Sequence, residues 1–147
     1  MPVNLEWIES PSKQDWLDLE KMFVDAPLEW FEQSADQSAR AFINSMLDKD
    51  YRIAVGRFND RLIVSSVLRP ALTEDSTPIV GTKLVVQNLL VRKLTRGRGV
   101  AKQLLVRLCQ WADDAKVPLC VYDEEQHYRI LLEFGFLYES GAWIRQR

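Results

Sequence analysis

The sequence predicts one α+β domain, and three observations support that prediction. Short runs of alternating apolar and polar residues, typical of strands, occur near both ends and in the middle of the chain. Between them lie longer stretches whose apolar residues recur at helical spacing. Hydrophobic residues make up 47% of the 147 residues, which at this length supplies a self-sufficient core and excludes a disordered chain. No repeat or linker divides the sequence, so we expect a single domain spanning residues 1–147.

The N-terminal third predicts a strand followed by two helices. Apolar and polar residues alternate over Val3–Ile8, which is typical of a strand. Ser12 and Asp15 then form a pattern that resembles a capping box at the start of a helix. Apolar residues recur at helical spacing over Ser34–Leu47, which predicts the second helix.

A tight hairpin comes next. Two β-rich runs, Tyr51–Phe58 and Arg61–Leu68, are separated only by Asn59 and Asp60. Both residues tolerate a positive φ angle, as the two central residues of a tight hairpin turn require. The sequence therefore predicts two antiparallel strands at this point.

The remainder of the chain predicts one loop and six further elements. Two prolines, an acidic pair and a glycine indicate a long exposed loop over Arg69–Gly81. The elements are a third antiparallel strand at Thr82–Val91, a helix at Val100–Ala115, a strand at Val117–Tyr122, a helix at Glu124–Phe134 and a terminal hairpin of Phe136–Tyr138 with Ala142–Arg145.

Charge and histidine content limit the classes of function. Lys and Arg number 19 against 21 Asp and Glu, a net charge of −2, which argues against general nucleic-acid binding. The one histidine, His127, excludes a metal site that needs two imidazoles, and any histidine-dependent catalysis would have to use it. We therefore expect no metal and no nucleic-acid partner.

Cysteine usage and hydropathy indicate the compartment. Cys109 and Cys120 fall in apolar stretches and form no CxxC motif, which indicates buried reduced thiols. The N-terminus has no signal sequence, and no apolar run approaches the roughly 20 residues of a membrane span. We expect a soluble cytoplasmic protein with no membrane partner.

The most informative segment is Arg96–Ala101, between a strand and an amphipathic helix. A helix start offers unpaired N–H groups and the positive end of a dipole, which together favour a phosphate. Gly97 and Gly99 let the backbone curl and approach a ligand, and Arg98 and Lys102 add positive charge. The segment is neither a Rossmann fingerprint nor a P-loop. Two alternatives remain. One is a helix cap made flexible by its glycines, with solvated arginines, and the other is an RGRG RNA-binding tract.

The context of this segment resembles the GNAT acetyltransferase superfamily. Arg96, Gly99 and Ala101 match the family motif Q/R-x-x-G-x-G/A. The motif follows a strand that ends in L-x-V, here Leu89–Val91, and Phe134–Phe136 is similar to the family's later LGF. The resemblance implies the GNAT fold, a layered α/β/α arrangement in which helices flank a mixed, mostly antiparallel sheet.

The resemblance also implies binding of acetyl-CoA without a metal. The pantetheine arm would pair with backbone groups of Leu89 and Val91, and the pyrophosphate would bind the amides of Arg98 to Lys102. The residues that the resemblance assigns to the cofactor are Leu89, Leu90, Val91, Arg96, Gly97, Arg98, Gly99, Val100, Ala101 and Lys102.

Two positions that carry the chemistry in many GNAT enzymes hold residues that cannot perform it. The position of the base is Gln87 and that of the tyrosine acid is Leu131, and neither exchanges a proton. Tyr122 and Tyr128 are candidates for a substitute acid, although an apolar ring with a solvated hydroxyl is the commoner role. The acidic run Asp123–Glu125 is explained by the start of a helix.

Within the superfamily, the chain resembles the PanZ family, also called PanM. The stretches that carry this resemblance are Tyr51–Leu62, Leu89–Val100 and Gly135–Trp143. PanZ proteins sense acetyl-CoA and, once loaded, bind the precursor of aspartate α-decarboxylase and promote its self-cleavage. The resemblance therefore implies that precursor as a partner, with Arg57 and Asn59 as contact residues.

Several readings stay open. The hairpin around Arg57 and Asn59 also fits an ordinary turn in which Asn serves the geometry. The chain departs from the PanZ pattern by extra residues around Trp30–Leu47, a longer loop at Arg69–Gly81 and a shorter stretch between Tyr122 and Phe134. Beside an acetyl-CoA-binding regulator, the alternatives are an active N-acetyltransferase for a small amine or a protein amine, and an interaction module that binds another acyl-CoA.

Overall fold

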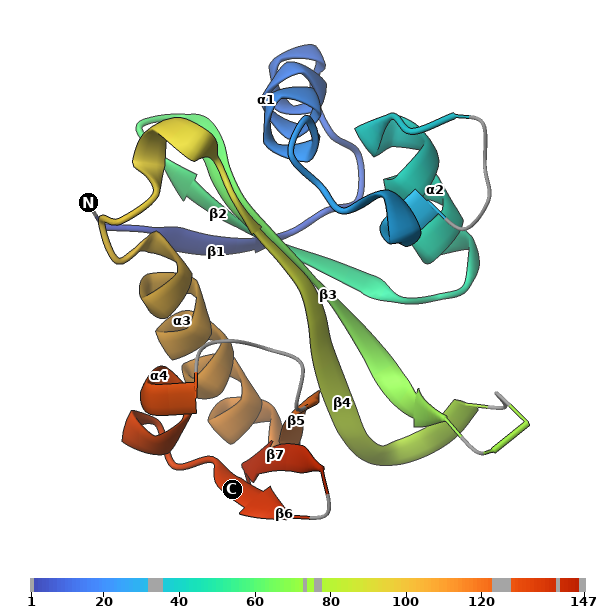
Figure 1. Ribbon diagram of the computed structural model, residues 1–147, viewed down its shortest axis with the longest axis vertical. Helices are drawn as coiled ribbons and strands as arrows, with labels where there is room; N and C mark the ends of the chain where they lie inside the picture. The colour runs from blue at the N-terminus through green and yellow to red at the C-terminus, as the bar shows by residue number, and fades with distance from the viewer. Residues whose placement is uncertain are drawn as a thin grey trace.

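Seven strands of the described chain form one sheet, in the order β1-β2-β3-β4-β5-β7-β6 (Figure 1). The computed structural model describes residues 2–31, 36–72, 74–75, 78–122, 128–139 and 141–145. Neighbouring strands are antiparallel except β4 and β5, which run parallel. The predicted α+β architecture, a mixed and mostly antiparallel sheet flanked by helices, is confirmed.

The helices and strands follow the chain order that the sequence predicts. The strands are β1 (Asn4–Trp7), β2 (Arg52–Phe58), β3 (Arg61–Leu72), β4 (Pro78–Val91), β5 (Leu119–Tyr122), β6 (Leu137–Glu139) and β7 (Ala142–Arg145). The helices are α1 (Lys13–Phe23), α2 (Ala39–Asp48), α3 (Val100–Ala115) and α4 (Tyr128–Glu133), with short 3-10 turns η1 (Leu28–Phe31) and η2 (Lys93–Thr95).

Hydrogen bonds at the helix starts explain where α1 and α2 begin. The predicted capping box is present, because the Asp15 N–H donates to Ser12 Oγ at 3.0 Å and the Ser12 N–H donates to Asp15 Oδ2 at 3.2 Å. Helix α2 starts at Ala39, later than the predicted Ser34, a position that lies outside the described residues. Ser38 is its N-cap and accepts from a backbone N–H of the first turn.

The hairpin prediction is confirmed, and the loop prediction is wrong at both ends of the predicted range. Asn59 and Asp60 have φ angles of 48° and 62°, the conformation that a two-residue turn requires. The predicted loop over Arg69–Gly81 is strand at both ends, since β3 runs to residue 72 and β4 begins at residue 78. A register shift beside Pro70 accommodates the residue that cannot donate to the ladder.

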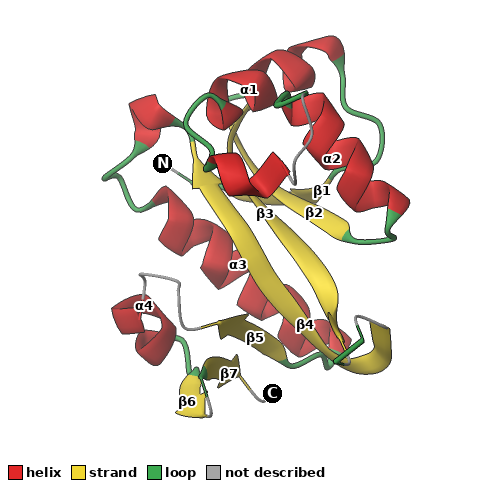
Figure 2. Ribbon diagram, turned by 45° about the vertical axis from the view of Figure 1, so that its right-hand side comes forward, coloured by secondary structure: helices red, strands yellow, loops and turns green. Residues whose placement is uncertain are grey.

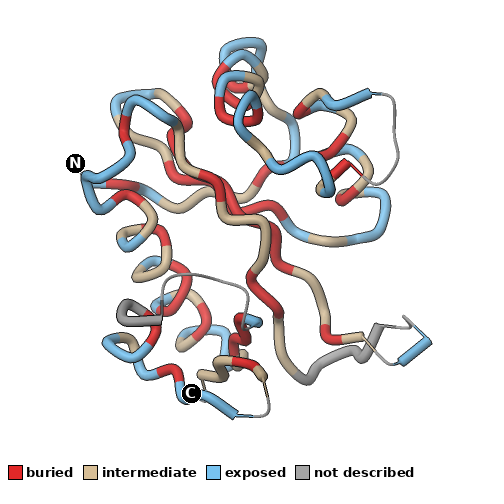
Figure 3. Tube along the Cα trace, in the orientation of Figure 1, coloured by how far each residue is buried: buried red, intermediate tan, exposed pale blue. Residues whose placement is uncertain are grey.

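Helices cover the two faces of the sheet at different places (Figure 2). Helices α1 and α2 pack over β2 and β3, where Leu19 and Ile43 are fully buried in one apolar cluster with Val55. Helix α3 packs on the opposite face, where Leu104 and Leu119 are fully buried in a second cluster. Buried residues accordingly follow the central strands (Figure 3). These two clusters fix β4 and the start of α3 in the positions that form the site.

Candidate cofactor site and partner surface

An opening forms between β4 and β5 because the two strands pair only briefly. Within the described residues, Leu84 pairs with Leu119 and Val85 with Cys120, and no further pair follows. Beyond these pairs, β4 continues beside β3 while β5 pairs on its other side with β7. The β5-facing edge of β4 therefore lacks a strand partner over residues 86–91 of the described chain.

Backbone alternation determines which groups face this opening. The Arg92 N–H donates to the Ile63 carbonyl at 2.8 Å, so Arg92 faces β3. Because successive strand residues direct their backbone groups to opposite edges, Leu89 and Val91 face the opening. Leu90 pairs with β3, and its side chain is buried in the cluster under α1 and α2. The opening thus offers N–H and C=O groups where the pantetheine arm was expected.

A bulge interrupts β4 beside the opening. Asn88 and Leu89 stand opposite the single residue Ser66, and Asn88 has a φ of 54°. Ser66 Oγ donates to the Gln87 carbonyl at 2.8 Å and fixes the bulge. Asn88 Oδ1 is buried and accepts no hydrogen bond from any described residue. A buried acceptor of this kind requires a donor, and a ligand amide N–H is such a donor.

Sequence reasoning missed Asn88. An asparagine inside an apolar strand was the signal that could have identified it, because asparagine adopts a positive φ more readily than other residues with a side chain. A bulge at that position turns the strand locally and leaves a residue unpaired. Only the pairing of β4 with β3 in the structure shows that this bulge lies beside the opening.

The glycines of the predicted turn have the backbone conformation that glycine permits. Gly97 and Gly99 have φ angles of 78° and 74°, and Gly99 is the N-cap of α3. A Cβ at either position would meet no protein atom within 4 Å. The positive φ angles therefore favour glycine at both positions, and the space beside each one is free of described protein atoms.

The start of α3 leaves backbone donors available. The first helical hydrogen bond is donated by the Gln103 N–H to the Gly99 carbonyl at 3.0 Å. The amides of Val100, Ala101 and Lys102 precede that bond and, with no side chain at Gly99, have no cap. They form the positive end of the helix dipole, the kind of helix end that favours an anion.

A hollow of about 220 Å³ lies at this turn. It brings together most of the residues that the sequence assigned to the cofactor, and adds Thr95, whose hydroxyl donates to the Arg92 carbonyl at 2.9 Å. Leu89, Leu90 and Arg98 do not line it. The lining residues are Val91, Thr95, Arg96, Gly97, Gly99, Val100, Ala101 and Lys102.

Two of the cations at the turn already have partners. Arg96 Nε donates to the Val91 carbonyl at 3.0 Å, and its Nη2 lies 3.5 Å from Asp25. Lys102 Nζ lies 3.0 Å from a carboxylate oxygen of Glu133. Both pairs are half-exposed, so they are weak and exchangeable with an anionic ligand. Arg98 is exposed, with no partner among the described residues.

The two positions that the resemblance assigns to the base and the acid hold side chains that exchange no proton. Gln87 lies on β4 beside the opening, and its Oε1 accepts from Arg69 Nε at 2.7 Å. Leu131 is 2% exposed in the cluster beneath α3. Tyr122 ends β5 at the opening and is 37% exposed. Tyr128 opens α4, but its side chain lies outside the described part, as do His127 and Asp123–Glu125.

Arg57 holds the predicted docking hairpin to its neighbours. Its Nε donates to Glu6 at 2.8 Å, and its Nη1 and Nη2 donate to the Asp15 carboxylate at 3.1 and 3.2 Å. These carboxylates raise the pKa of Arg57 and outweigh the effect of burial. Asn59, in contrast, stands exposed at the turn. The structure therefore gives Arg57 a role within the chain and leaves Asn59 accessible to a partner.

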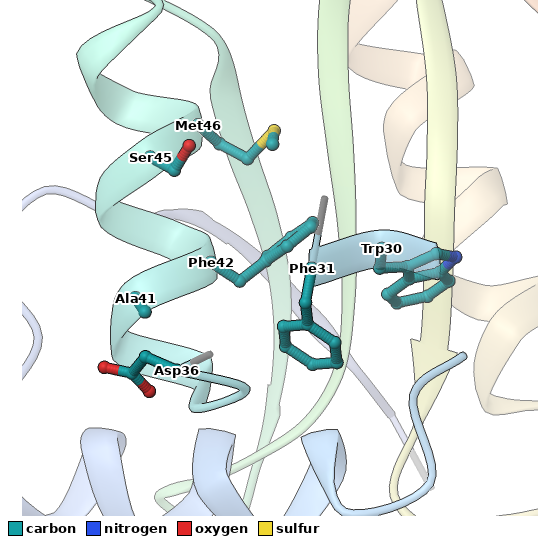
Figure 4. A pocket seen from close by; sticks show the side chains of 7 residues that line it. All are labelled: Trp30, Phe31, Asp36, Ala41, Phe42, Ser45 and Met46. Carbon is teal, nitrogen blue, oxygen red and sulfur yellow. The ribbon is translucent and has the colours of Figure 1, made fainter. Parts of the chain in front are cut away.

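A second hollow, of about 140 Å³, lies between η1 and α2 (Figure 4). Its wall is aromatic, with the Trp30 and Phe42 rings stacked 5.9 Å apart. None of the residues assigned to cofactor or partner lines it.

Among the described residues, no group of three His, Cys, Asp or Glu could hold a metal, and no described helix is long and apolar enough to cross a membrane.

Comparisons with known proteins agree with this geometry. The family model described as "Acetyltransferase (GNAT) domain, PanZ" matches residues 2–117. The PanD regulatory factor of Escherichia coli (strain K12) is 28% identical over 97% of this chain and 98% of its own. A solution structure of the E. coli putative N-acetyl transferase YhhK bound to coenzyme A has a TM-score of 0.60 at 22% identity, covering 100% of both chains. A GNAT family acetyltransferase from Brucella melitensis in complex with acetyl-CoA has a TM-score of 0.63 at 12% identity, covering 97% of this chain and 88% of that one.

Proposed function

The chain belongs to the PanZ family of acetyltransferase (GNAT) domains, and we propose that it binds acetyl-CoA and regulates aspartate α-decarboxylase, PanD, by promoting maturation of its precursor. The observation that carries this proposal is the family match over residues 2–117, together with likeness to the PanD regulatory factor along 97% of the chain. We also propose that residues 1–147 form one domain, because β5, β6 and β7 complete the same sheet.

Three features of the site support acetyl-CoA as the ligand. The opening presents backbone groups of Leu89 and Val91 to an arm that carries amides of its own. Asn88 Oδ1, buried and without a donor in the described chain, supplies an acceptor for one of those amides. The amides of Val100–Lys102 and the exposed Arg98 fit the pyrophosphate. Bound acetyl-CoA would bring an acetyl thioester to the opening, and the residues named here would hold and orient it.

The residues at the catalytic positions support a regulator. Gln87 is held by Arg69 and cannot take a proton, and Leu131 is buried. The thiols also have no evident chemistry, because burial raises the pKa of Cys109 to about 11, and a buried thiol of high pKa is inert. Free buried Cys109 and Cys120 suit a reducing compartment, which supports a cytoplasmic location.

The experiment that tests the proposal combines this protein with the aspartate decarboxylase precursor of the same organism. Self-cleavage of the precursor is followed on denaturing gels, with and without acetyl-CoA, and complex formation by isothermal titration calorimetry. We expect binding and faster cleavage at saturating acetyl-CoA, and little of either without it. Absence of both effects at saturating acetyl-CoA would contradict the proposal.

A parallel assay addresses acetyl transfer. Free CoA is measured across a panel of small amines and peptide amines, with the Tyr122→Phe variant as control. The regulator proposal predicts no amine-dependent release above the rate of the variant. Release that disappears in Tyr122→Phe would establish an enzyme with Tyr122 as its acid.

A further inference from the structure

The opening between β4 and β5 has a closed end. In the described chain, the last pair of the parallel ladder before the strands separate is Val85 with Cys120. Both strands run in the same direction, so Gln87 and Tyr122, each two residues beyond that pair, border the opening from its two sides. Because side chains alternate along a strand, both point to the face that carries Val85. The opening therefore narrows toward the Val85–Cys120 pair.

The length of the pantetheine arm places its thioester near this closed end. From the phosphate oxygen to the sulfur the arm has about twelve backbone bonds, as many as four extended residues, and it spans roughly 14 Å. The hollow at the start of α3, where we propose that the pyrophosphate binds, is lined by Val91. Four residues back along β4 is Gln87. An arm laid along the β5-facing edge of β4 would bring its thioester beside Gln87, with the acyl group directed at the closed end.

Side chains fill both faces of the sheet at the closed end. Val86 and Val121 belong to the cluster beneath α3 and are only 7% and 5% exposed. On the other face, Val85 and Cys120 are fully buried in a cluster with Ala142. An acyl chain that extends farther than the closed end would have to enter this packing, and adding methylene groups to a packed core is unfavourable.

Arg69 reaches across the opening on the face that carries Val85. It is the register partner of Val85 on β3, so its side chain lies on that face. Its Nε donates to Gln87 Oε1 at 2.7 Å and its Nη1 to the Pro70 carbonyl at 3.0 Å. Its guanidinium carbon lies 5.6 Å from the centre of the Tyr122 ring, within the range of a cation–π contact. A side chain from β3 thus contacts both strands that border the opening.

We propose that this protein selects acyl-CoA by chain length and that Arg69 sets the limit. The short acetyl group would end at the closed end. Each further methylene would have to enter the packed side chains there or leave through the face that the Arg69 guanidinium crosses. The ligand class is therefore the CoA thioesters of short acyl chains, bound more tightly than thioesters of longer chains. This inference rests on the proposed function, in which acetyl-CoA is the ligand.

The test measures the affinities for CoA, acetyl-CoA and hexanoyl-CoA by isothermal titration calorimetry, together with the thermal midpoint of each variant. Arg69→Ala removes the side chain that crosses the opening. Gln87→Ala removes the acceptor that holds this side chain, and it serves as the second variant if Arg69→Ala folds poorly. The readout is the ratio of the acetyl-CoA affinity to the hexanoyl-CoA affinity, because a lost positive charge changes the attraction of the shared phosphates equally for both thioesters.

Arg107→Ala is the matched control. Arg107 is exposed on α3, and its Nε and Nη1 donate to neutral acceptors, the Val3 carbonyl and Gln110 Oε1, at 3.3 Å each. The substitution therefore removes an arginine of similar bonding that contacts β1 and its own helix. CoA without an acyl group shows whether the site still binds the rest of the cofactor in each variant.

We expect the unaltered protein to bind acetyl-CoA at least about tenfold more tightly than hexanoyl-CoA. Arg69→Ala should lower this ratio to about threefold or less, Gln87→Ala should lower it in the same direction, and Arg107→Ala should leave it unchanged. Equal affinities of the unaltered protein for the two thioesters would overturn this inference and leave acetyl-CoA binding intact. A ratio that neither Arg69→Ala nor Gln87→Ala changes would also overturn it. Binding of none of the three ligands would overturn the proposed function as well.

Discussion

Gly99 meets two requirements of the proposed site. It adopts a left-handed backbone conformation, and it leaves room for the cofactor to approach the start of α3. An added methyl group would strain a φ of 74°, at a residue that lines the hollow where we propose that the pyrophosphate binds. We expect Gly99→Ala to weaken acetyl-CoA binding by at least about tenfold, which is roughly 1.4 kcal/mol. Gly141→Ala is the matched control, because Gly141 also has a positive φ, of 85°, and equally open surroundings in the β6–β7 turn. Equal losses of affinity in the two variants would contradict the placement of the site.

A substitution of Asn88 is a second single-residue test of the cofactor site. Asn88→Gly removes a buried acceptor that has no donor in the described chain, and glycine accepts the φ of 54° without strain. We expect the thermal midpoint to stay within a few degrees or rise, while acetyl-CoA binds about threefold to tenfold more weakly because a ligand N–H loses its acceptor. Unchanged affinity, measured by calorimetry, would separate Asn88 from the cofactor. Asn59→Gly in the exposed turn is the control.

Individual functional residues were predictable only where one position determines the chemistry. Gln87 and Leu131 could be identified from the motif spacing as unable to act as base or acid. The partners of Arg57 were not foreseeable, because Glu6 and Asp15 come from elements distant in sequence that only the fold brings together. The contact of Arg69 with Gln87 was hidden for the same reason, because Arg69 stands inside a segment predicted to be a loop.

At the scale of elements, α1 is joined to the hairpin by Asp18. This fully buried side chain accepts from Arg61 Nε at 2.9 Å and from the Leu62 N–H at 3.0 Å. Burial would raise the pKa of Asp18, but these hydrogen bonds and one from Gln14 outweigh burial and hold the pKa below its ordinary value of 3.8. The interaction therefore stabilises the fold above about pH 4 and is lost as the pH falls through the lowered native pKa.

We expect Asp18→Asn to reduce the free energy of unfolding at pH 7 by about 1–3 kcal/mol, less than for a fully buried pair because Arg61 is 38% exposed. The variant should also lose less of its thermal midpoint than the unaltered protein between about pH 4 and pH 2. The control is Asp25→Asn, whose surface pair with Arg96 should be worth under about 1 kcal/mol. Identical acid sensitivity in Asp18→Asn and the unaltered protein would contradict this role for Asp18.

Elements defined by local signals were predicted closely. The capping box of α1, the β2–β3 turn and the bounds of α3 all depend on neighbouring residues, and each is found where the sequence indicated. The end of β3 and the start of β4 were missed because pairing across the ladder overcame the turn-forming composition around Pro70. At such positions, tertiary contacts override the secondary structure that the local sequence favours.

For the whole molecule, cofactor binding should be measurable as stability. A ligand that binds only the native state adds about 2.7 kcal/mol when its concentration is 100 times the dissociation constant. For a chain of this size we expect acetyl-CoA to raise the thermal midpoint by about 5–10 °C at that concentration. The shift, measured by differential scanning fluorimetry, should shrink in Gly99→Ala at the same concentration. Absence of any shift in the unaltered protein would count against acetyl-CoA as ligand.

The order of elements could be read from the sequence, and with the phosphate-binding turn it was sufficient to predict the fold and the family. The opening between β4 and β5 could not, because its existence depends on where a parallel pairing stops. The sequence of neither strand shows where the pairing ends, since Val85, which is paired, and Val86, which is not, are equally apolar and both buried. Long-range register is the property that single-sequence patterns lack.

The half-paired state of β4 has a kinetic consequence. The Leu90 amide lies against β3, whereas the amides of Leu89 and Val91 face the opening without a strand partner in the described chain. Hydrogen–deuterium exchange of the free protein should therefore alternate along this stretch, fast at residues 89 and 91 and slow at residue 90. Loading with acetyl-CoA should slow the two fast amides and leave the slow one unchanged, so the strand itself reports whether the cofactor is bound.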